Sequence, residues 1–116
     1  LCSNMVICKQ EKSIQEIFNL NLTISAIRGV EKGKNETFTE FPISIGRLPD
    51  NDFQLKDNYV SRRHCTIYLD DDRFTVSDLK STNKTILNEK SLDSPTYFTD
   101  GDKLIIGRNL LVLNYN

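Results

Sequence analysis

The amino-acid sequence predicts an all-β fold, an antiparallel β-sandwich. Apolar and polar residues alternate in short runs, as in strands that bury one face of a sheet. Turn residues interrupt these runs about every 8 to 12 residues, which leaves room for about ten strands. No stretch of the chain has the apolar spacing of a long helix. Short strands at this spacing are typical of sandwich domains, whose binding sites usually lie on the loops at one end.

The first strands are expected between residues 20 and 46. Residues 20–26 alternate between apolar and polar side chains, which predicts a strand with one buried face. The charged, glycine-containing segment 29–35 predicts a turn. A short strand is expected over 38–41, and the proline after it restricts this strand to a sheet edge or a strand start. Another strand is expected over 43–45, and Gly46 ends it.

The same alternation continues to the end of the chain. It places strands over 53–55, 65–69, 74–76, 86–88, 103–106 and 110–115. The intervening turns are expected at 48–52, at 70–72, near Pro95, at Asp100 and at 107–109. Two polar loops remain, 56–63 and 78–85, and they carry two arginines and a cluster of Ser, Thr and Asn residues.

The start of the chain has a different pattern. Residues 13–16 match a capping box, so a short helix is one interpretation of this region, and a strand or a disordered end is another. We therefore predict an N-terminal extension over 1–19 and one domain over 20–116. Because the chain begins at Leu1 and not at Met, we expect it to be a piece of a longer protein.

Charge, hydropathy and cysteine content exclude several function classes. The net charge is −1, with no clear basic stripe, so no nucleic-acid partner is expected. No apolar run approaches the roughly 18 residues of a membrane span, and no signal peptide is visible. Cys2, Cys8 and Cys65 form no pairing pattern, and only His64 is available to complete a zinc site. We expect reduced thiols, an intracellular compartment, no membrane and no metal or other cofactor.

Three short motifs follow one another at the expected strand–loop junctions. They are Gly46-Arg47, Ser61-x-x-His64 and Ser81-Thr82-Asn83-x-Thr85-x-x-Asn88. In this order, and with this strand rhythm, they make residues 22–115 resemble the forkhead-associated (FHA) domain family. The resemblance implies a β-sandwich of two twisted sheets with about eleven strands. It also implies recognition of phosphothreonine, so the expected partner is a phosphothreonine-containing protein or peptide.

Residue chemistry suits this ligand. A phosphothreonine carries close to two negative charges and three acceptor oxygens. Arg47 offers a planar fork of charged donors, and the hydroxyl of Ser61 adds one rotatable donor. The resemblance makes these two residues the central phosphate contacts, and it assigns a supporting contact to Arg62.

The second polar loop is expected to hold the peptide itself. The side-chain amide of Asn83 can bond a peptide backbone on both sides of the phosphoresidue, and the resemblance gives it this role. It also gives Thr82 a phosphate or backbone contact. Lys84 departs from the family, which usually has Gly there. If that position has a positive φ, the substitution costs about 1–2 kcal/mol.

Other residues of the motifs are expected to be structural. Gly46 should allow a sharp turn at a strand end. The resemblance implies that His64 bridges the binding loops, without a catalytic or metal-binding role. Asp78 and Asn88 are expected to tie loops to the backbone.

Peptide selectivity is expected to depend on side chains near the two polar loops. We predict an apolar or aromatic preference at the third residue after the phosphothreonine, read by Tyr59 and Val60. Lys84 is a further candidate for peptide specificity. Arg63 is either a solvated charge or part of a basic rim, and Arg108 is a turn residue with no assigned role.

The same motif residues distinguish the competing function classes. A phosphothreonine reader that recruits its parent protein is preferred, monomeric as an isolated domain. The alternative is a phosphate-independent interaction or dimerisation scaffold, which has no need of intact Arg47, Ser61 and Asn83. No nucleotide loop, nucleophile elbow or kinase motif indicates an enzyme or a catalytic residue. Because the family is common in checkpoint kinases, a kinase parent, the nucleus and the DNA damage response are the expected context.

Overall fold

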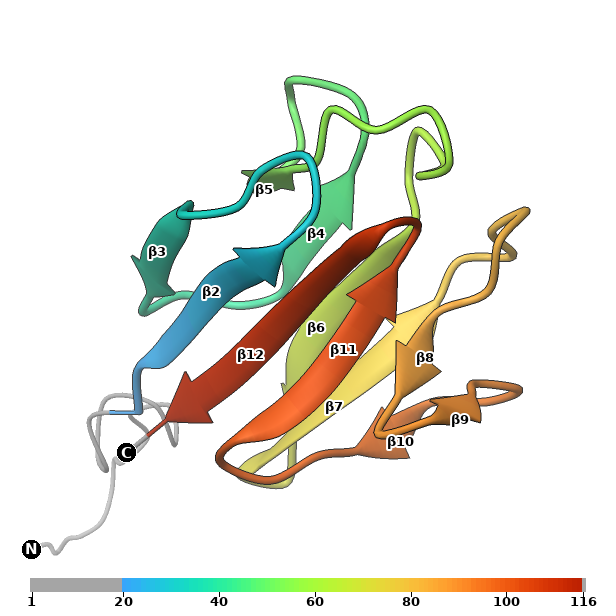
Figure 1. The fold of residues 1–116 in the computed structure, drawn as a ribbon. Coiled ribbons are helices and arrows are strands. Elements are labelled where there is room, and N and C mark those ends of the chain that lie inside the picture. Colours follow the sequence, from blue (N-terminus) through green and yellow to red (C-terminus); the bar gives the residue numbers. More distant parts are fainter. Residues whose placement is uncertain (1–19, 116) are drawn as a thin grey trace, which may run out of the picture.

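The computed structural model describes residues 20–115. The short helix considered around Ser13 and the whole predicted extension 1–19 lie outside this range. Within it the chain forms strands and no helix. The predicted all-β sandwich is confirmed, because the strands build two facing sheets (Figure 1).

One sheet has five strands and the other has six. The five-stranded sheet contains, in spatial order, β10 (Thr96–Tyr97), β7 (Arg73–Asp78), β6 (Cys65–Asp70), β4 (Ile43–Gly46) and β5 (Phe53–Gln54). The six-stranded sheet contains β3 (Asn35–Phe38), β2 (Leu22–Arg28), β12 (Asn109–Tyr115), β11 (Asp102–Ile106), β8 (Ile86–Leu87) and β9 (Lys90–Ser91). Neighbouring strands are antiparallel, except that β4 and β5 are parallel.

The structure corrects the predicted elements in two places. The strand expected over 38–41 runs instead over Asn35–Phe38, because the turn before it closes at Lys34 and the chain pairs with β2 at once. The short strands β9 and β10 were not predicted. Each has only two residues, too few for an alternating pattern to be visible in the sequence.

The β6–β7 hairpin follows the predicted pattern closely. Asp70 pairs with Arg73, and the turn residues Asp71 and Asp72 have φ values of 51° and 60°. Two consecutive positive φ values are typical of the tight turn that matches strand twist, and Asp tolerates this conformation. The predicted hairpin turn over 70–72 is confirmed.

The core lies between the two sheets and is formed by the inward face of each strand. On β12, Leu111 and Leu113 are fully buried, whereas Val112 between them faces outward and is partly exposed. An aromatic cluster closes the far end of the core, where Phe74 packs against Phe41, Phe98 and Tyr115. The alternation read from the sequence is therefore the alternation of buried and exposed side chains.

Four segments meet at the opposite end of the sandwich from that cluster: the end of β4, the β5–β6 loop, the loop after β7, and the β11–β12 turn (Figure 1). Backbone hydrogen bonds join the first three. The N–H of His64 donates to the carbonyl of Ile45, and the N–H of Leu79 donates to the carbonyl of His64, both at 2.9 Å. This end, which we call the loop end, contains the motif residues except Asn88, which lies in the β8–β9 turn.

Truncation of a side chain on the buried face of β12 is expected to destabilise the protein more than truncation on its outer face. Leu111→Ala should lower the free energy of unfolding by about 2–5 kcal/mol, because it leaves a cavity between the sheets. Val112→Ala removes a similar apolar group from the outer face of the same strand and should cost well below about 2 kcal/mol. Urea denaturation followed by circular dichroism measures both values. Equal losses would mean that the register of β12 is wrong.

Candidate functional site

Arg47 follows β4 directly and is held in place by the β5–β6 loop. Its backbone N–H donates to the carbonyl of Ser61, and its Nε donates to the carbonyl of Val60, each at 3.0 Å. Among residues 20–115, neither terminal nitrogen of its guanidinium has a hydrogen-bond or carboxylate partner. The side chain is therefore oriented at Nε and retains free charged donors at its tip.

A groove of about 340 Å³ opens beside this guanidinium. Its lining comes from the end of β4, the β5–β6 loop and the loop after β7, namely Arg47, Asn58, Tyr59, Val60, Ser61, Arg62, Thr82 and Asn83. The structure thus brings together all the predicted phosphopeptide contacts. The volume is at the small end of ligand sites, and the groove fits one side chain with its adjoining backbone.

Ser61 links the two loops that line the groove. Its Oγ accepts a hydrogen bond from the backbone N–H of Thr82 at 3.1 Å. Its own N–H donates to Nδ1 of His64 at 3.0 Å. Because Oγ accepts here, the hydroxyl proton of Ser61 stays available as a donor to a ligand.

His64 is fully buried beneath the groove. Since Nδ1 accepts from Ser61, the proton of the neutral ring is on Nε2, which has no hydrogen-bond partner of normal geometry among the described residues. Burial lowers the pKa of His64, and the nearby Asp78 carboxylate and Asn83 carbonyl oppose this effect without reversing it. The imidazole is therefore a neutral spacer that contacts both loops. No cluster of His, Cys, Asp or Glu in residues 20–115 could hold a metal ion.

Asp78 shapes the loop that presents Thr82 and Asn83. Its carboxylate accepts bonds from the backbone N–H and hydroxyl of Ser81 and from those of Thr85. Burial opposes ionisation of Asp78, but these hydrogen bonds outweigh it and hold its pKa below the usual value. A charged Asp78 thus fixes both ends of the 81–85 turn.

Asn83 is already engaged in the free protein. Its Nδ2 donates to the carbonyl of Tyr59 at 2.9 Å, across the groove. Lys84 is exposed and does not have a positive φ; in this loop the left-handed residue is Lys80, with φ of 58°. The predicted strain at Lys84 is therefore absent, because the loop makes its sharp bend four residues earlier.

A buried carboxylate that the sequence did not indicate joins the β5–β6 loop to the β11–β12 turn. Asp57 is 1% exposed and accepts from the backbone N–H of Tyr59, from Nδ2 of Asn109, and from both backbone and side chain of Arg108. Burial opposes its ionisation, but the hydrogen bonds from Tyr59 and Arg108 prevail and lower its pKa. Arg108, which was given no role, is the ion-pair partner of Asp57, with Nη2 at 3.0 Å from Oδ1.

Arg108 also positions Tyr59. Its guanidinium carbon lies 4.7 Å from the centre of the Tyr59 ring, and Tyr59 is 54% exposed beside the groove. Gly107 lets the β11–β12 turn lie close to Val60 on the β5–β6 loop. Its φ is 61°, and a Cβ at this position would lie 2.8 Å from Cγ2 of Val60. The Gly-Arg-Asn turn was a signal in the sequence, but its partner Asp57 is about fifty residues away in the chain.

Gly46 is required for a different reason from the one predicted. Its φ is not positive, so the expected sharp turn is not what favours glycine. A Cβ at this position would overlap the carbonyl of Arg62 and come within 2.8 Å of Nδ2 of Asn51. That same Nδ2 donates to the carbonyls of Leu48 and Arg62, so Gly46 makes room for a loop-to-loop bond.

The remaining predicted residues occupy distinct positions. Val60 is 1% exposed, so its side chain is closed to a peptide, contrary to the role in selectivity given to it. Arg62 is exposed at the groove, whereas Arg63 forms an ion pair with Asp50 at 2.7 Å. Asn88 lies in the β8–β9 turn, where its Oδ1 accepts from the N–H of Lys103.

Comparison with known proteins agrees with this arrangement. The model of the FHA domain family matches residues 43–107. The glycogen accumulation regulator GarA of Mycobacterium tuberculosis is 38% identical over 85 residues, which are 73% of this chain and 52% of GarA. The oxoglutarate dehydrogenase inhibitor of Corynebacterium jeikeium is 34% identical over 85 residues, 73% of this chain and 58% of that protein. The chain thus spans about half the length of these curated relatives.

Solved structures show the same fold. An FHA domain from a study of phosphothreonine-dependent FHA domain interactions has a TM-score of 0.72 at 30% identity, covering 81% of this chain and 95% of that one. The FHA domain of FhaA, crystallised with the intracellular domain of Rv3910, has a TM-score of 0.71 at 30% identity, covering 80% and 99%. A plant FHA domain, from Arabidopsis thaliana, has a TM-score of 0.78 at 26% identity, covering 82% and 85%.

The ionised carboxylate of Asp57 is expected to make stability depend on pH. Its folded pKa is lowered, so it stabilises the fold above the pKa of the unfolded chain, about 4, and this contribution disappears as the pH falls further. Asp57→Asn should lose about 1–3 kcal/mol at neutral pH, and its difference from wild type should shrink below about pH 4.

Thermal unfolding of both proteins between about pH 3 and 7 tests this. Asp93→Asn, which alters an exposed carboxylate outside the loop end, is the control and should stay close to wild type throughout. A pH-independent deficit of Asp57→Asn would show that packing, and not charge, is what the carboxylate provides.

Proposed function

The chain belongs to the FHA domain family, and on this basis we propose that it is a phosphothreonine-dependent peptide-binding module that brings its parent protein to phosphorylated partners. Arg47 carries the proposal. Its guanidinium is fixed at Nε by the Val60 carbonyl, while its outer nitrogens have no acidic partner in the described chain and border the groove. A charged fork kept open in this way suits a doubly charged phosphate.

The phosphate would be bound by three donor groups around the groove. The tip of Arg47 supplies two nitrogens, the hydroxyl of Ser61 supplies a third donor, and Arg62 adds charge or a backbone contact. Charge-assisted hydrogen bonds contribute roughly 1.5–3 kcal/mol each. After the cost of association this gives about −7 to −8 kcal/mol, which is micromolar binding. We infer weak, phosphate-dependent capture of short peptides.

The peptide backbone would be held from the other side. Oδ1 of Asn83 is open beside the groove, and its amide nitrogen can move from the Tyr59 carbonyl to a peptide carbonyl. Thr82 lines the groove, and its backbone N–H donates to Oγ of Ser61, which supports a role for Thr82 beside the phosphate. Tyr59, with its ring exposed and held from one side by Arg108, is the side chain best placed to read a residue after the phosphothreonine.

The alternative, a phosphate-independent scaffold, has less support. A scaffold gains nothing from a buried histidine and two carboxylates that together position free donors around a groove. An enzyme is also disfavoured, because relatives such as GarA and the oxoglutarate dehydrogenase inhibitor are named as a regulator and an inhibitor. Within residues 20–115, no helix is long and apolar enough to cross a membrane.

The identity of the parent protein is a separate part of the proposal. The curated relatives named above are bacterial regulators, so we propose a signalling regulator that acts through its bound phosphoprotein. These relatives give no support to the nuclear location, the DNA damage response or the checkpoint kinase expected from the sequence. Those remain predictions about the rest of the parent chain.

A peptide titration tests the phosphate-binding role. Degenerate peptides with a central phosphothreonine should bind in the micromolar range, and those with unmodified threonine should not bind. Phosphoserine should bind about fourfold or more weakly, as the loss of one methyl group implies. Arg47→Ala should weaken phosphothreonine binding by about 10- to 150-fold, because charge-assisted bonds are lost.

The matched control is Arg73→Ala. This arginine lies on β7 outside the groove, with its guanidinium 3.8 Å from the Tyr97 ring, so its removal should leave affinity unchanged. If wild type, Arg47→Ala and Arg73→Ala all bound phosphorylated and unmodified peptides equally, the domain would instead be a phosphate-independent interaction domain.

Affinity should also decrease on acidification. The second pKa of a phosphothreonine is near 6, so a site that takes the dianion should bind about tenfold more weakly at about pH 5 than at about pH 7.5. His64 has a lowered pKa, and the stability that its neutral form provides declines as the pH falls below its ordinary value. Circular dichroism at each pH therefore has to show a folded protein. A flat affinity profile would mean that the monoanion is sufficient.

A further inference from the structure

Apolar side chains form a stripe across the outer face of the six-stranded sheet. Leu110 on β12 pairs with Ile105 on β11, and Ile105 pairs with Ile86 on β8. On the other side of Leu110, β2 contributes Ile27, the extra residue of a bulge at this point. All four alternate along their strands with buried residues, so they face away from the core. We call these four residues, together with Val112 on β12, the outer stripe.

The outer stripe is one patch and not a set of isolated surface residues. Ile27 is 44% exposed and Ile105 is 36% exposed, and the other three members are partly exposed. Paired residues on one face of a sheet have their Cβ atoms about 4.5–5.5 Å apart, so the apolar surfaces adjoin one another. Four strands at a spacing of about 4.8 Å make the stripe about 14 Å long. A contiguous apolar patch of this kind indicates an interaction surface.

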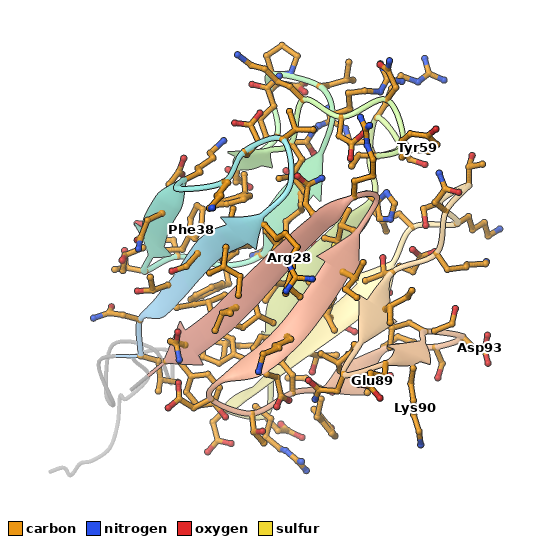
Figure 2. All side chains as sticks on the ribbon, viewed as in Figure 1. Arg28, Phe38, Tyr59, Glu89, Lys90 and Asp93 are labelled. Carbon is orange, nitrogen blue, oxygen red and sulfur yellow. The ribbon has the colours of Figure 1, made fainter. Side chains whose placement is uncertain are left out.

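Two cations accompany the outer stripe on this face. Arg28 pairs with Leu110, Lys103 pairs with Val112, and both charged side chains are exposed. Figure 2 looks onto this face and labels Arg28 near the middle of the sheet. Neither cation has an ion-pair partner within residues 20–115. No outward position of β2, β8, β11 or β12 carries a carboxylate, so the face is apolar and positive.

We propose that the outer stripe, with Arg28 and Lys103, is a second docking surface for a partner segment that presents apolar side chains flanked by Asp or Glu. The apolar side chains would cover the stripe, and the carboxylates would pair with the two cations. A length of about 14 Å corresponds to fewer than three helical turns of about 5.4 Å, so a short acidic amphipathic helix has the matching size. The surface lies outside the groove, so this inference does not depend on phosphothreonine.

The charges favour this occupant over the other candidates. A symmetric contact between two copies of the chain through this face would bring four cations together without a counter-charge. A nucleic-acid backbone would neutralise the cations but leave the apolar stripe without a partner. An anionic membrane would also attract the cations, but no outward position of β2, β8, β11 or β12 carries an aromatic side chain to insert into it.

Two unphosphorylated synthetic peptides of about sixteen residues test the proposal. Both are amphipathic helices with Leu along one side, and their polar side carries Glu in one peptide and Lys in the other. The Glu peptide should bind wild type about tenfold more tightly at about 50 mM salt, because ion pairs with the two cations replace repulsion. The amide chemical shifts that change during the titration of isotope-labelled protein should lie on β2, β11 and β12, and not around the groove.

Reversal of the two cations should reverse the preference between the peptides. The double variant Arg28→Glu/Lys103→Glu should bind the Lys peptide more tightly than the Glu peptide. The matched control Lys56→Glu/Lys80→Glu makes the same change of charge at exposed loop positions outside this face, and it should keep the wild-type preference. A variant that was only structurally damaged would lose affinity for both peptides without exchanging them.

The apolar contact is tested by a separate variant. Ile105→Thr/Leu110→Thr keeps strand-forming residues on β11 and β12 but removes apolar surface from the stripe. It should weaken binding of the Glu peptide by about five- to tenfold, and thermal unfolding should show that the variant is folded during the titration.

Several outcomes would overturn the proposal. These are no binding of either peptide, equal binding of both peptides, or shift changes confined to the groove around Arg47. Vesicles of phosphatidylserine and phosphatidylcholine that bind wild type but not the charge-reversal variant would make the face a membrane surface. A dimer in analytical ultracentrifugation that Ile105→Thr/Leu110→Thr abolishes would make it a contact between two copies of the chain.

Discussion

A carboxylate remains charged inside a protein only if donors surround it, and the loop end depends on one that is surrounded in this way. Asp57 accepts hydrogen bonds from Tyr59 on its own loop and from Arg108 and Asn109 on the β11–β12 turn. The first loop continues into the five-stranded sheet and the second belongs to the six-stranded sheet. The two sheets are therefore joined at the loop end by a polar centre, in addition to the apolar packing between their inner faces.

The hydrogen bonds of this polar centre and of two further residues determine the shape of the groove. His64 supports Ser61 from below, and Asp78 holds the turn that carries Thr82 and Asn83. The donors proposed to bind a phosphate are thus positioned by hydrogen bonds from other atoms of the same residues. Arg47 is held through Nε, and Ser61 is held through its backbone N–H. Such preorganisation limits the ordering cost of binding, because the loops do not have to find their arrangement when a ligand arrives.

The parts of the structure that the sequence predicted are those with local signals. Alternating residues and three aspartates defined the β6–β7 hairpin, and the resemblance of the motifs to the FHA family indicated Arg47, Ser61 and Asn83, which the structure brings to one groove. Two-residue strands such as β9 and β10 carry no period, so they were missed. The Asp57–Arg108 pair was missed because its members are far apart in sequence and neither has a periodic signal. Gly46 was identified, but the reason, a close approach of Arg62 and Asn51, is visible only in three dimensions.

The hydrogen bond between the Asn83 amide and the Tyr59 carbonyl has a consequence for any ligand that uses this amide. In the free protein the Tyr59 carbonyl accepts a hydrogen bond from Nδ2 of Asn83 at 2.9 Å, so it competes with any ligand carbonyl for this donor. A ligand gains only the difference between its own bond and this one, and it must leave the Tyr59 carbonyl to water. The bond therefore limits the net affinity that any ligand can gain from the Asn83 amide.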